Sequence, residues 1–94
     1  MNKQELIFTR WKDLGSIFYK KGIYRFIIYE NQTITLINPI GIPMQLDVIS
    51  QHQEGGAFAF GVLHSEYRMP GSLILKGNTL ILMWEGMNGI KLKM

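Results

Sequence analysis

The chain has no cysteine and only three prolines, and these scarcities already narrow the possible classes of protein. Without cysteine, neither a disulfide framework nor a thiolate metal site can form. Because this suits a reducing compartment, we expect a cytoplasmic protein. No apolar run approaches the roughly 18 residues of a membrane-spanning helix, and the charged start of the chain lacks the apolar core of a secretory signal. We therefore expect no membrane partner.

Charged residues are also scarce, since they make up 18% of the 94 residues whereas hydrophobic residues make up 47%. This balance is typical of a globular chain rather than a disordered one. The length predicts a single domain over residues 1–94 with one modest core. The net charge of +3 gives a mild preference for a polyanion or an acidic protein as partner.

Signatures of catalysis and of nucleotide binding are missing: there is no P-loop and no dinucleotide-binding glycine motif, and the acids are scattered. Two His-x-Glu pairs, His52–Glu54 and His64–Glu66, would each offer two metal ligands in an extended chain. The strand pairing that keeps the apolar residues of this region on one face separates the two pairs, and it puts Asp47 and His64 on opposite faces. No serine has a predicted base beside it. We therefore predict no enzyme, no metal site and no cofactor, with His52 in a solvated loop and His64 in a structural or rim position.

Residues 22–38 carry the clearest structural pattern, that of a β-hairpin. β-branched and aromatic residues dominate this segment, and residues 30–32 are its only polar interruption. A three-residue turn there pairs Phe26 with Leu36 and gives the positive φ to Asn31 or Gln32. One face of the hairpin is then strongly apolar and consists of Tyr24, Phe26, Ile28, Ile34 and Leu36.

Other segments before the middle of the chain show the same alternation. Residues 16–20 are predicted to form a short strand that ends in a bend at residues 20–22. Residues 42–49 form the next strand, which begins at an edge or a bulge because Pro43 lacks an amide donor. Residues 50–56 are predicted to be a polar loop.

The second half of the chain continues the pattern. Residues 57–64 form a strand with small residues on one face, where we expect a helix to pack. Residues 72–76 and 79–84 form a second hairpin across a two-residue turn at Gly77-Asn78. Its core face consists of Leu73, Leu75, Leu80, Leu82 and Trp84. Residues 90–94 close the chain, with Lys91 and Lys93 outward as the guard of an exposed edge.

Residues 2–14 differ from the rest, because their apolar residues are spaced as in a helix. Asn2 can cap such a helix, Glu5 completes a capping box, and Gly15 can end it. The apolar stripe consists of Leu6, Ile7, Trp11 and Leu14. We expect this helix to pack on the sheet or to plug one end of a barrel, with Trp11 inward.

The predicted fold is therefore mainly β: an N-terminal helix (residues 2–14) is followed by about eight short antiparallel strands in a meander (residues 16–94). Short connections favour strands that neighbour one another in sequence order. Eight such strands can close into a small barrel filled by its own side chains, or they can remain a strongly curved open sheet. The sequence leaves both possibilities open.

This order of elements resembles a shortened lipocalin-like barrel of the calycin group. The resemblance lies in the helix that leads into Gly15, in the eight antiparallel strands and in the hairpin at residues 77–80, and it covers most of the chain. Lipocalins carry a Gly-x-Trp motif at the start of the barrel, whereas Gly15-Ser16-Ile17 has isoleucine in the third position. The resemblance implies a small-molecule site at the mouth of the barrel, and no binding residue carries over.

Two predicted hairpins have a second face that is also partly apolar, and this is the strongest functional signal in the chain. The residues of these faces are Ile74, Ile81 and Met83 in the last hairpin and Ile27 and Tyr29 in the first. An exposed apolar sheet surface favours association with another protein or with a second copy. We therefore predict a non-enzymatic binding module that acts by protein–protein association, with a protein partner or as a homo-oligomer. A small-molecule binder is the first alternative.

Basic residues gather in the first quarter of the chain, and the predicted basic patch consists of Arg10, Lys12, Lys20, Lys21 and Arg25. Lys91 and Lys93 join this patch if the two ends of the chain lie close together. With tyrosines nearby, such a patch is suited to nucleic acid. We favour the simpler interpretation of a solvated face, so nucleic acid is the second alternative.

Overall fold

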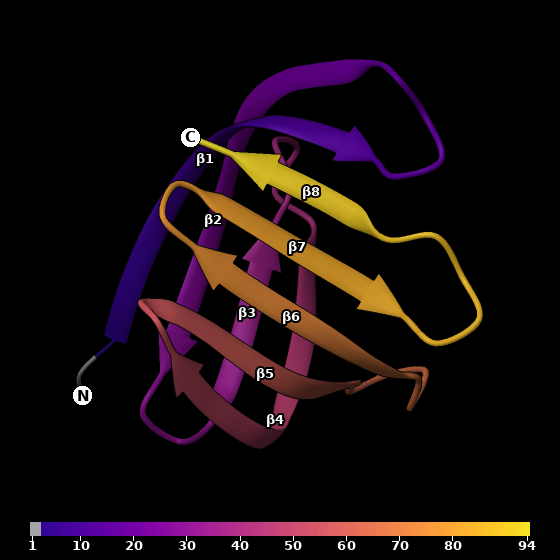
Figure 1. The fold of residues 1–94 in the computed structure, drawn as a ribbon. Coiled ribbons are helices and arrows are strands. Elements are labelled where there is room, and N and C mark those ends of the chain that lie inside the picture. The colour runs from indigo at the N-terminus through magenta and orange to yellow at the C-terminus, as the bar shows by residue number, and fades with distance from the viewer. Residues whose placement is uncertain (1–2) are drawn as a thin grey trace.

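The computed structural model describes residues 3–94, which form eight antiparallel strands closed into a barrel (Figure 1). The strands follow sequence order around the barrel, and β1 pairs with β8 to complete it. They are β1 (Lys3–Asp13), β2 (Tyr19–Tyr29), β3 (Thr33–Ile37), β4 (Pro43–Glu54), β5 (Ala57–His64), β6 (Pro70–Lys76), β7 (Thr79–Trp84) and β8 (Ile90–Lys93). The prediction of a mainly β, antiparallel meander is confirmed, and the sheet is closed rather than open.

The predicted N-terminal helix is wrong, because its residues form β1 and the described part of the chain has no helix. A register shift explains the misleading spacing. Phe8 pairs with Tyr24 but Arg10 pairs with Lys21, so β2 contributes one more residue than β1 between these pairs. The shift breaks the alternation of β1, and Phe8 and Trp11 both contact the core although they are three residues apart. Such a spacing is also typical of one face of a helix.

The other features of the predicted helix change accordingly. Asn2, the predicted cap, lies outside the described residues. Ile7 and Leu14 are exposed rather than parts of a buried stripe. Trp11 packs against the core as expected, and so does Leu6. With no helix among residues 3–94, the small residues of β5 do not receive the predicted helix either.

The hairpin predicted over residues 22–38 is confirmed in its register, since Phe26 pairs with Leu36. Gln32 takes a φ of 64°, so it is one of the two residues predicted for that corner. The segment before it differs from the prediction, because a separate strand over residues 16–20 and a bend after it are absent. Instead β2 runs without interruption for 11 residues.

The β4–β5 hairpin is longer than predicted, because β4 continues to Glu54 and the polar segment 50–56 is mostly strand. Only Gly55 and Gly56 form the turn, and their φ values of 58° and 81° suit glycine. Val48 pairs with Val62, as the predicted register requires, and the pairing then shifts by one residue.

The last strands form the predicted hairpin but leave no edge. The turn at Gly77-Asn78 has a φ of 58° at Gly77, the first of its two positions, as a type II′ turn requires. β8 pairs with β7 on one side and with β1 on the other. Lys91 and Lys93 therefore guard no edge, and that prediction is wrong because the barrel is closed.

The interior of the barrel is filled by apolar side chains from all eight strands. Phe8 and Phe26 are fully buried and meet edge to face, with ring centroids 6.3 Å apart. The buried cluster consists of Phe8, Tyr24, Phe26, Ile34, Leu36, Leu46, Phe60, Val62, Leu73, Leu75, Leu80, Leu82 and Leu92. Since this cluster occupies the middle of the barrel, a small molecule can bind only at an end.

Candidate functional site

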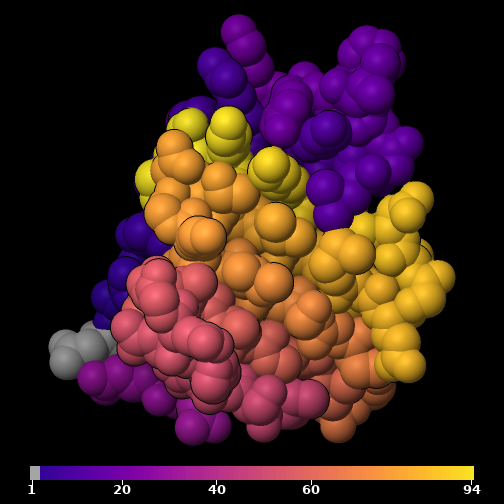
Figure 2. Space-filling model, viewed as in Figure 1, coloured from indigo at the N-terminus to yellow at the C-terminus, as the bar shows by residue number. Residues whose placement is uncertain are grey.

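The two ends of the barrel are built from different connections. Because the strands alternate in direction, the β1–β2, β3–β4, β5–β6 and β7–β8 loops share one end, which we call the mouth. The β2–β3, β4–β5 and β6–β7 turns share the other end. Figure 1 shows the β1–β2, β5–β6 and β7–β8 loops on the right and the β4–β5 and β6–β7 turns on the left. In the space-filling view, the β1–β2 region projects above the last strands (Figure 2).

A pocket of about 510 Å³ opens at the mouth. It lies between the ends of β1, β2 and β8 on one side and the β3–β4 loop on the other. Lys20 is the only charged residue in the lining, as far as the described residues go. The lining consists of Trp11, Lys20, Tyr24, Leu36, Asn38, Pro39, Ile40, Ile42, Pro43, Met44 and Ile90. The pocket is thus an apolar surface with one cation at its side.

The β3–β4 loop forms one wall of this pocket, and Asn38 fixes its conformation. The Asn38 Oδ1 atom accepts hydrogen bonds from the amides of Ile40 and Ile42, at 3.2 and 2.9 Å. Its backbone carbonyl accepts one from the amide of Gly41, which has a φ of 86°. These are the contacts by which asparagine stabilises a tight turn. They hold the side chains of Ile40 and Ile42 at the entrance of the pocket.

Trp11 and Lys20 form the opposite wall as a cross-strand pair of β1 and β2. The Lys20 Nζ atom lies 5.1 Å from the centroid of the Trp11 ring, within the range of a cation–π contact. Tyr24 lies deeper, and burial raises the pKa of its phenol, which therefore stays neutral. The wall thus offers one accessible positive charge, held over an aromatic ring beside an apolar surface.

A second, smaller pocket of about 290 Å³ lies at the opposite end of the barrel. Its lining mixes apolar residues such as Phe58 with Gln4, Glu30, Gln32 and Gln51. Ligand sites usually measure about 300–1,000 Å³ and are mostly apolar. The mouth pocket meets both criteria and is the better candidate site.

A scan against protein-family models found no match, and searches of curated proteins and of solved structures found no significant similarity. The resemblance to lipocalin-like barrels therefore stays a prediction. In residues 3–94 there is no helix long and apolar enough to cross a membrane.

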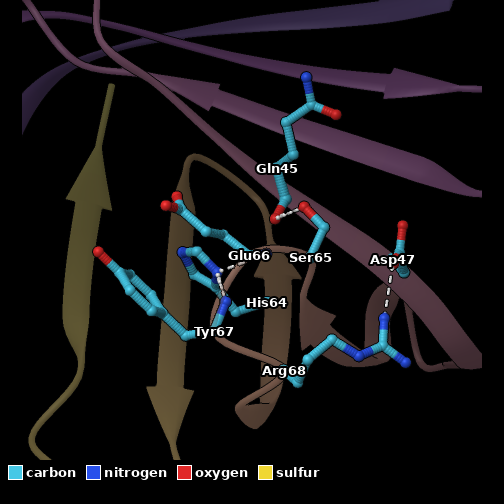
Figure 3. A network of polar contacts seen from close by, with 7 residues as sticks. All are labelled: Gln45, Asp47, His64, Ser65, Glu66, Tyr67 and Arg68. Atoms are coloured by element: carbon cyan, nitrogen blue, oxygen red, sulfur yellow. Dashed lines mark hydrogen bonds and ion pairs between the residues drawn. The ribbon is translucent and has the colours of Figure 1, made fainter.

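A polar network in the β5–β6 loop surrounds His64, and its hydrogen bonds hold the loop (Figure 3). The Nδ1 atom of His64 accepts hydrogen bonds from the backbone amides of Glu66 and Tyr67, at 3.2 and 3.1 Å. Asp47 instead faces Arg68, with 3.7 Å between Oδ2 and Nη1. His64 therefore has the structural position predicted for it, and Asp47 is separate from it as predicted.

The two His-x-Glu pairs do not converge. His52 pairs with Ala59 near the β4–β5 turn, and its ring lies 3.4 Å from the Glu54 carboxylate. His64 pairs with Leu46 near the mouth. His52 lies in β4 rather than in the predicted loop, although it is exposed. Within residues 3–94 there is no cluster of three potential metal ligands.

The residues of the predicted association surface do not form one surface. Ile74 and Ile81 are cross-strand neighbours on the outside of β6 and β7, and Met83 follows on the same face. Ile74 and Met83 are 39% and 38% exposed. Ile27 and Tyr29 belong to β2, which β8 and β1 separate from β7. Ile27 is only 3% exposed, so its place on an exposed surface is a wrong prediction.

An ion pair lies next to Ile27 on the same outer face of the sheet. Glu5 lies directly opposite Ile27 in β1, and the Glu5 carboxylate is 2.5 Å from Nε of Arg25. Thr35, itself buried, lies opposite Ile27 on the β3 side. The hydrogen bond from Arg25 lowers the pKa of Glu5 below its usual value near 4.5, so the pair persists into mildly acidic solution.

Three residues of the predicted basic patch do lie together, and two lysines from the other end of the sequence join them. Arg10 pairs with Lys21 of β2 and with Lys93 of β8. In the adjacent row, Lys12 pairs with Lys91 of β8. Paired residues point to the same side of a sheet. We call this set the basic face: Arg10, Lys12, Lys21, Lys91 and Lys93.

The two remaining residues of the predicted patch are placed elsewhere. Lys20 belongs to the mouth pocket, on the opposite side of the sheet from Lys21. Arg25 forms an ion pair with Glu5. Tyr19 does lie beside the basic face, with its ring centroid 5.4 Å from Nζ of Lys12. No ion pair within the described chain involves a residue of the basic face.

The β3–β4 loop is the part of the site that the sequence analysis missed. Residues 39–41 carried no prediction, and Ile42 was expected at the start of a strand, whereas β4 begins at Pro43. The signal was the presence of Ile40 and Ile42 among asparagine, glycine and prolines, since a short solvent-exposed turn has no structural need for two isoleucines.

Proposed function

We propose that the protein is a non-enzymatic binding protein that holds a small amphipathic molecule at the mouth of the barrel. The apolar part of the ligand would lie between Trp11 and the isoleucines of the β3–β4 loop, and an anionic group would lie beside Lys20. The observation that carries this proposal is the apolar pocket of about 510 Å³ with a single cation at its side. Its size is typical of sites that bury a small organic molecule.

The packed core restricts the ligand. Because Phe8 and Phe26 fill the barrel below the pocket, a ligand would lie across the mouth rather than along the axis. A medium-chain alkyl carboxylate or an aromatic carboxylate has the required combination of an apolar body and one negative charge. An alkyl ammonium ion of the same length would be repelled by Lys20.

Substitution of Lys20 by glutamine is expected to weaken binding of a medium-chain alkyl carboxylate about tenfold. The physical reason is that a hydrogen bond to a charged group contributes about 1.5 kcal/mol or more. Binding is measured by the fluorescence of Trp11, in a Trp84→Phe background that removes the only other tryptophan.

Lys21→Gln is the matched control, because Lys21 is adjacent in sequence but points to the outside of the barrel. It is expected to leave the affinity for the carboxylate unchanged. Equal binding of an alkyl ammonium ion, or equal losses in Lys20→Gln and Lys21→Gln, would contradict the proposed site.

A second candidate function is association with another copy of the chain through the outer side of β6 and β7. The half-exposed Ile74 and Met83 favour it, and Ile81 of β7 lies on the same side as both. A stable interface usually covers about 800 Å² on each partner. Three half-exposed residues provide only a part of this area, and for that reason we rank association below ligand binding.

If this association occurs, light scattering at high protein concentration is expected to give a mass above that of one chain. The variant Ile74→Lys is expected to give the mass of one chain under the same conditions. A lysine in the centre of the interface would be desolvated without a partner, which disfavours the assembly. A single-chain mass at every concentration would remove this candidate.

A further inference from the structure

Loops at the mouth expose large apolar side chains at their tips, and most of these side chains do not line the ligand pocket. Ile17 and Phe18 in the β1–β2 loop are 81% and 73% exposed. Ile40 in the β3–β4 loop and Met87 in the β7–β8 loop are also more than half exposed. Placing such side chains in water has no benefit for a barrel whose core is already filled.

The turns at the opposite end have a different composition. Residues 30–32, 55–56 and 77–78 contain only glutamate, asparagine, glutamine and glycine. The contrast between the two ends therefore follows the axis of the barrel, and it cannot be ascribed to loops in general.

The apolar tips belong to loops that touch one another. The amide of Leu14 donates a hydrogen bond to the carbonyl of Gly89 at 2.9 Å, which connects the β1–β2 loop to the β7–β8 loop. On the other side, Gly22 of β2 lies so close to Pro39 of the β3–β4 loop that a Cβ atom at Gly22 would be 2.6 Å from the proline ring. The β1–β2 hairpin therefore adjoins both other loops, and we call the exposed residues Ile17, Phe18, Ile40 and Met87 the apolar rim.

The basic face begins next to this rim, on the strands that carry the β1–β2 and β7–β8 loops. Lys12 and Lys91 form the row nearer the mouth, and the row of Arg10 follows. Asp13 is the acid closest to these rows in β1, and its carboxylate accepts a hydrogen bond from the amide of Gly15 at 2.8 Å. Apolar tips and a cluster of positive charges thus lie side by side on one part of the molecule.

We infer that the mouth end docks onto the surface of an anionic lipid bilayer. The apolar rim enters the interfacial region of the lipid, and the basic face lies against the negatively charged headgroups. Peripheral proteins bind membranes by this combination of apolar side chains and adjacent cations. The expectation of no membrane partner rested on the lack of an apolar run long enough for a membrane-spanning helix, and docking on one face of a bilayer needs no such run.

Nucleic acid fits the same surface less well. A polyanion would engage the cations but would leave Ile17 and Phe18 in water. Base stacking needs exposed aromatic rings beside the cations, and within residues 3–94 Tyr19 is the only aromatic residue paired with the basic face. The inference also does not depend on the proposed ligand, because Ile17, Phe18 and the residues of the basic face do not line the pocket.

Co-sedimentation of the full chain with vesicles tests the inference. Vesicles of phosphatidylcholine with phosphatidylserine are expected to bind the protein at low salt, whereas pure phosphatidylcholine vesicles bind it much less. The double variant Ile17→Ser, Phe18→Ser is expected to bind the anionic vesicles about tenfold more weakly. Lys21→Gln is expected to lower the affinity for the anionic vesicles about fivefold, since each cation near such a surface contributes about 1 kcal/mol.

Matched controls separate docking from general effects of apolarity and charge. Ile74→Ser removes an exposed isoleucine from the side of the barrel, and Lys76→Gln removes a lysine next to the β6–β7 turn. Both are expected to bind vesicles as the unchanged protein does. Since all of these side chains are exposed, thermal unfolding of each variant is expected to match the parent, which verifies that the fold is kept.

Three results would overturn the inference. The first is a failure of the protein to sediment with anionic vesicles at low salt. The second is sedimentation that depends on Lys21 but is unaffected by loss of Ile17 and Phe18; competition by an oligonucleotide would then assign the basic face to nucleic acid. The third is equal weakening by Ile74→Ser. Binding of the soluble alkyl carboxylate is expected to be unchanged in Ile17→Ser, Phe18→Ser, because neither residue lines the pocket, and this keeps the test distinct from that of the proposed function.

Discussion

Replacement of Phe26 by alanine is expected to lower the free energy of unfolding by about 3–5 kcal/mol. Phe26 is fully buried, and its ring meets that of Phe8 edge to face across the β1–β2 pair. The substitution removes this contact and leaves a cavity in the middle of the barrel, where the surrounding strands cannot collapse to fill it. Domains of this size have a total stability of roughly 5–15 kcal/mol, so the variant would be close to unfolding. Urea denaturation followed by tryptophan fluorescence measures the change.

Ile23→Ala is the control for this experiment. Ile23 lies in the same strand and is also a large apolar residue, but it is mostly exposed. Its replacement is expected to change the stability by about 0.5 kcal/mol or less. If Phe26→Ala were no less stable than Ile23→Ala, the packed interior described above would be wrong.

Replacement of Lys91 by proline is expected to lower the free energy of unfolding by about 1–3 kcal/mol or more, because it removes a hydrogen bond of the sheet and leaves the partner carbonyl unpaired. β8 is only four residues long and pairs with β7 and with β1. In a strand that is paired on both sides, each amide points to a neighbouring strand, so proline removes a hydrogen bond that water cannot replace. The prolines already present in strands, Pro43 and Pro70, stand at the first residue of β4 and of β6.

Hydrogen exchange of the amides in residues 10–13 measures this effect, because these residues form the β1 side of the contact with β8. Their protection is expected to fall sharply in Lys91→Pro. The matched variant Lys91→Ala keeps the backbone and is expected to differ from the parent by about 0.5 kcal/mol or less. Full protection of residues 10–13 in the proline variant would mean that β8 does not close the barrel.

The hairpins were predictable from the sequence because their register depends on residues that are close along the chain. In the β2–β3 hairpin, one polar turn and the alternation around it are enough to pair Phe26 with Leu36. The same holds for the β6–β7 hairpin, where Gly77-Asn78 determines the turn. Local pattern and final structure agree in these segments, as in most well-packed sheets.

β1 was not predictable in the same way. Its register shift opposite Gly22 and Ile23 interrupts the alternation, and the resulting pattern matches a helix better than a strand. What decides the outcome is pairing with β2 and with β8, and the latter is remote in sequence. Tertiary pairing of this kind overrides local propensity, and a single sequence contains no direct trace of it.

The candidate site depends on the same remote pairing. Lys91 and Lys93 reach Arg10 and Lys12 only because the barrel closes. Lys20 was grouped with Lys21 by sequence, but neighbouring residues in a strand point to opposite sides. Ile27 was expected on the surface, whereas it is buried beside the Glu5–Arg25 ion pair, which joins two strands. Individual strands therefore carried less information about function than their order around the barrel.

The pairing of Arg10 with Lys93 has a consequence for how the protein folds during synthesis. While β8 is still inside the ribosome, β1 and β7 each have a row of unpaired amides and carbonyls, which can attract other extended chains. The last step joins segments that are nearly the whole chain apart, and contacts over such sequence distances form slowly. A cell that makes this protein must therefore keep an unfinished sheet from aggregating until its eighth strand has emerged.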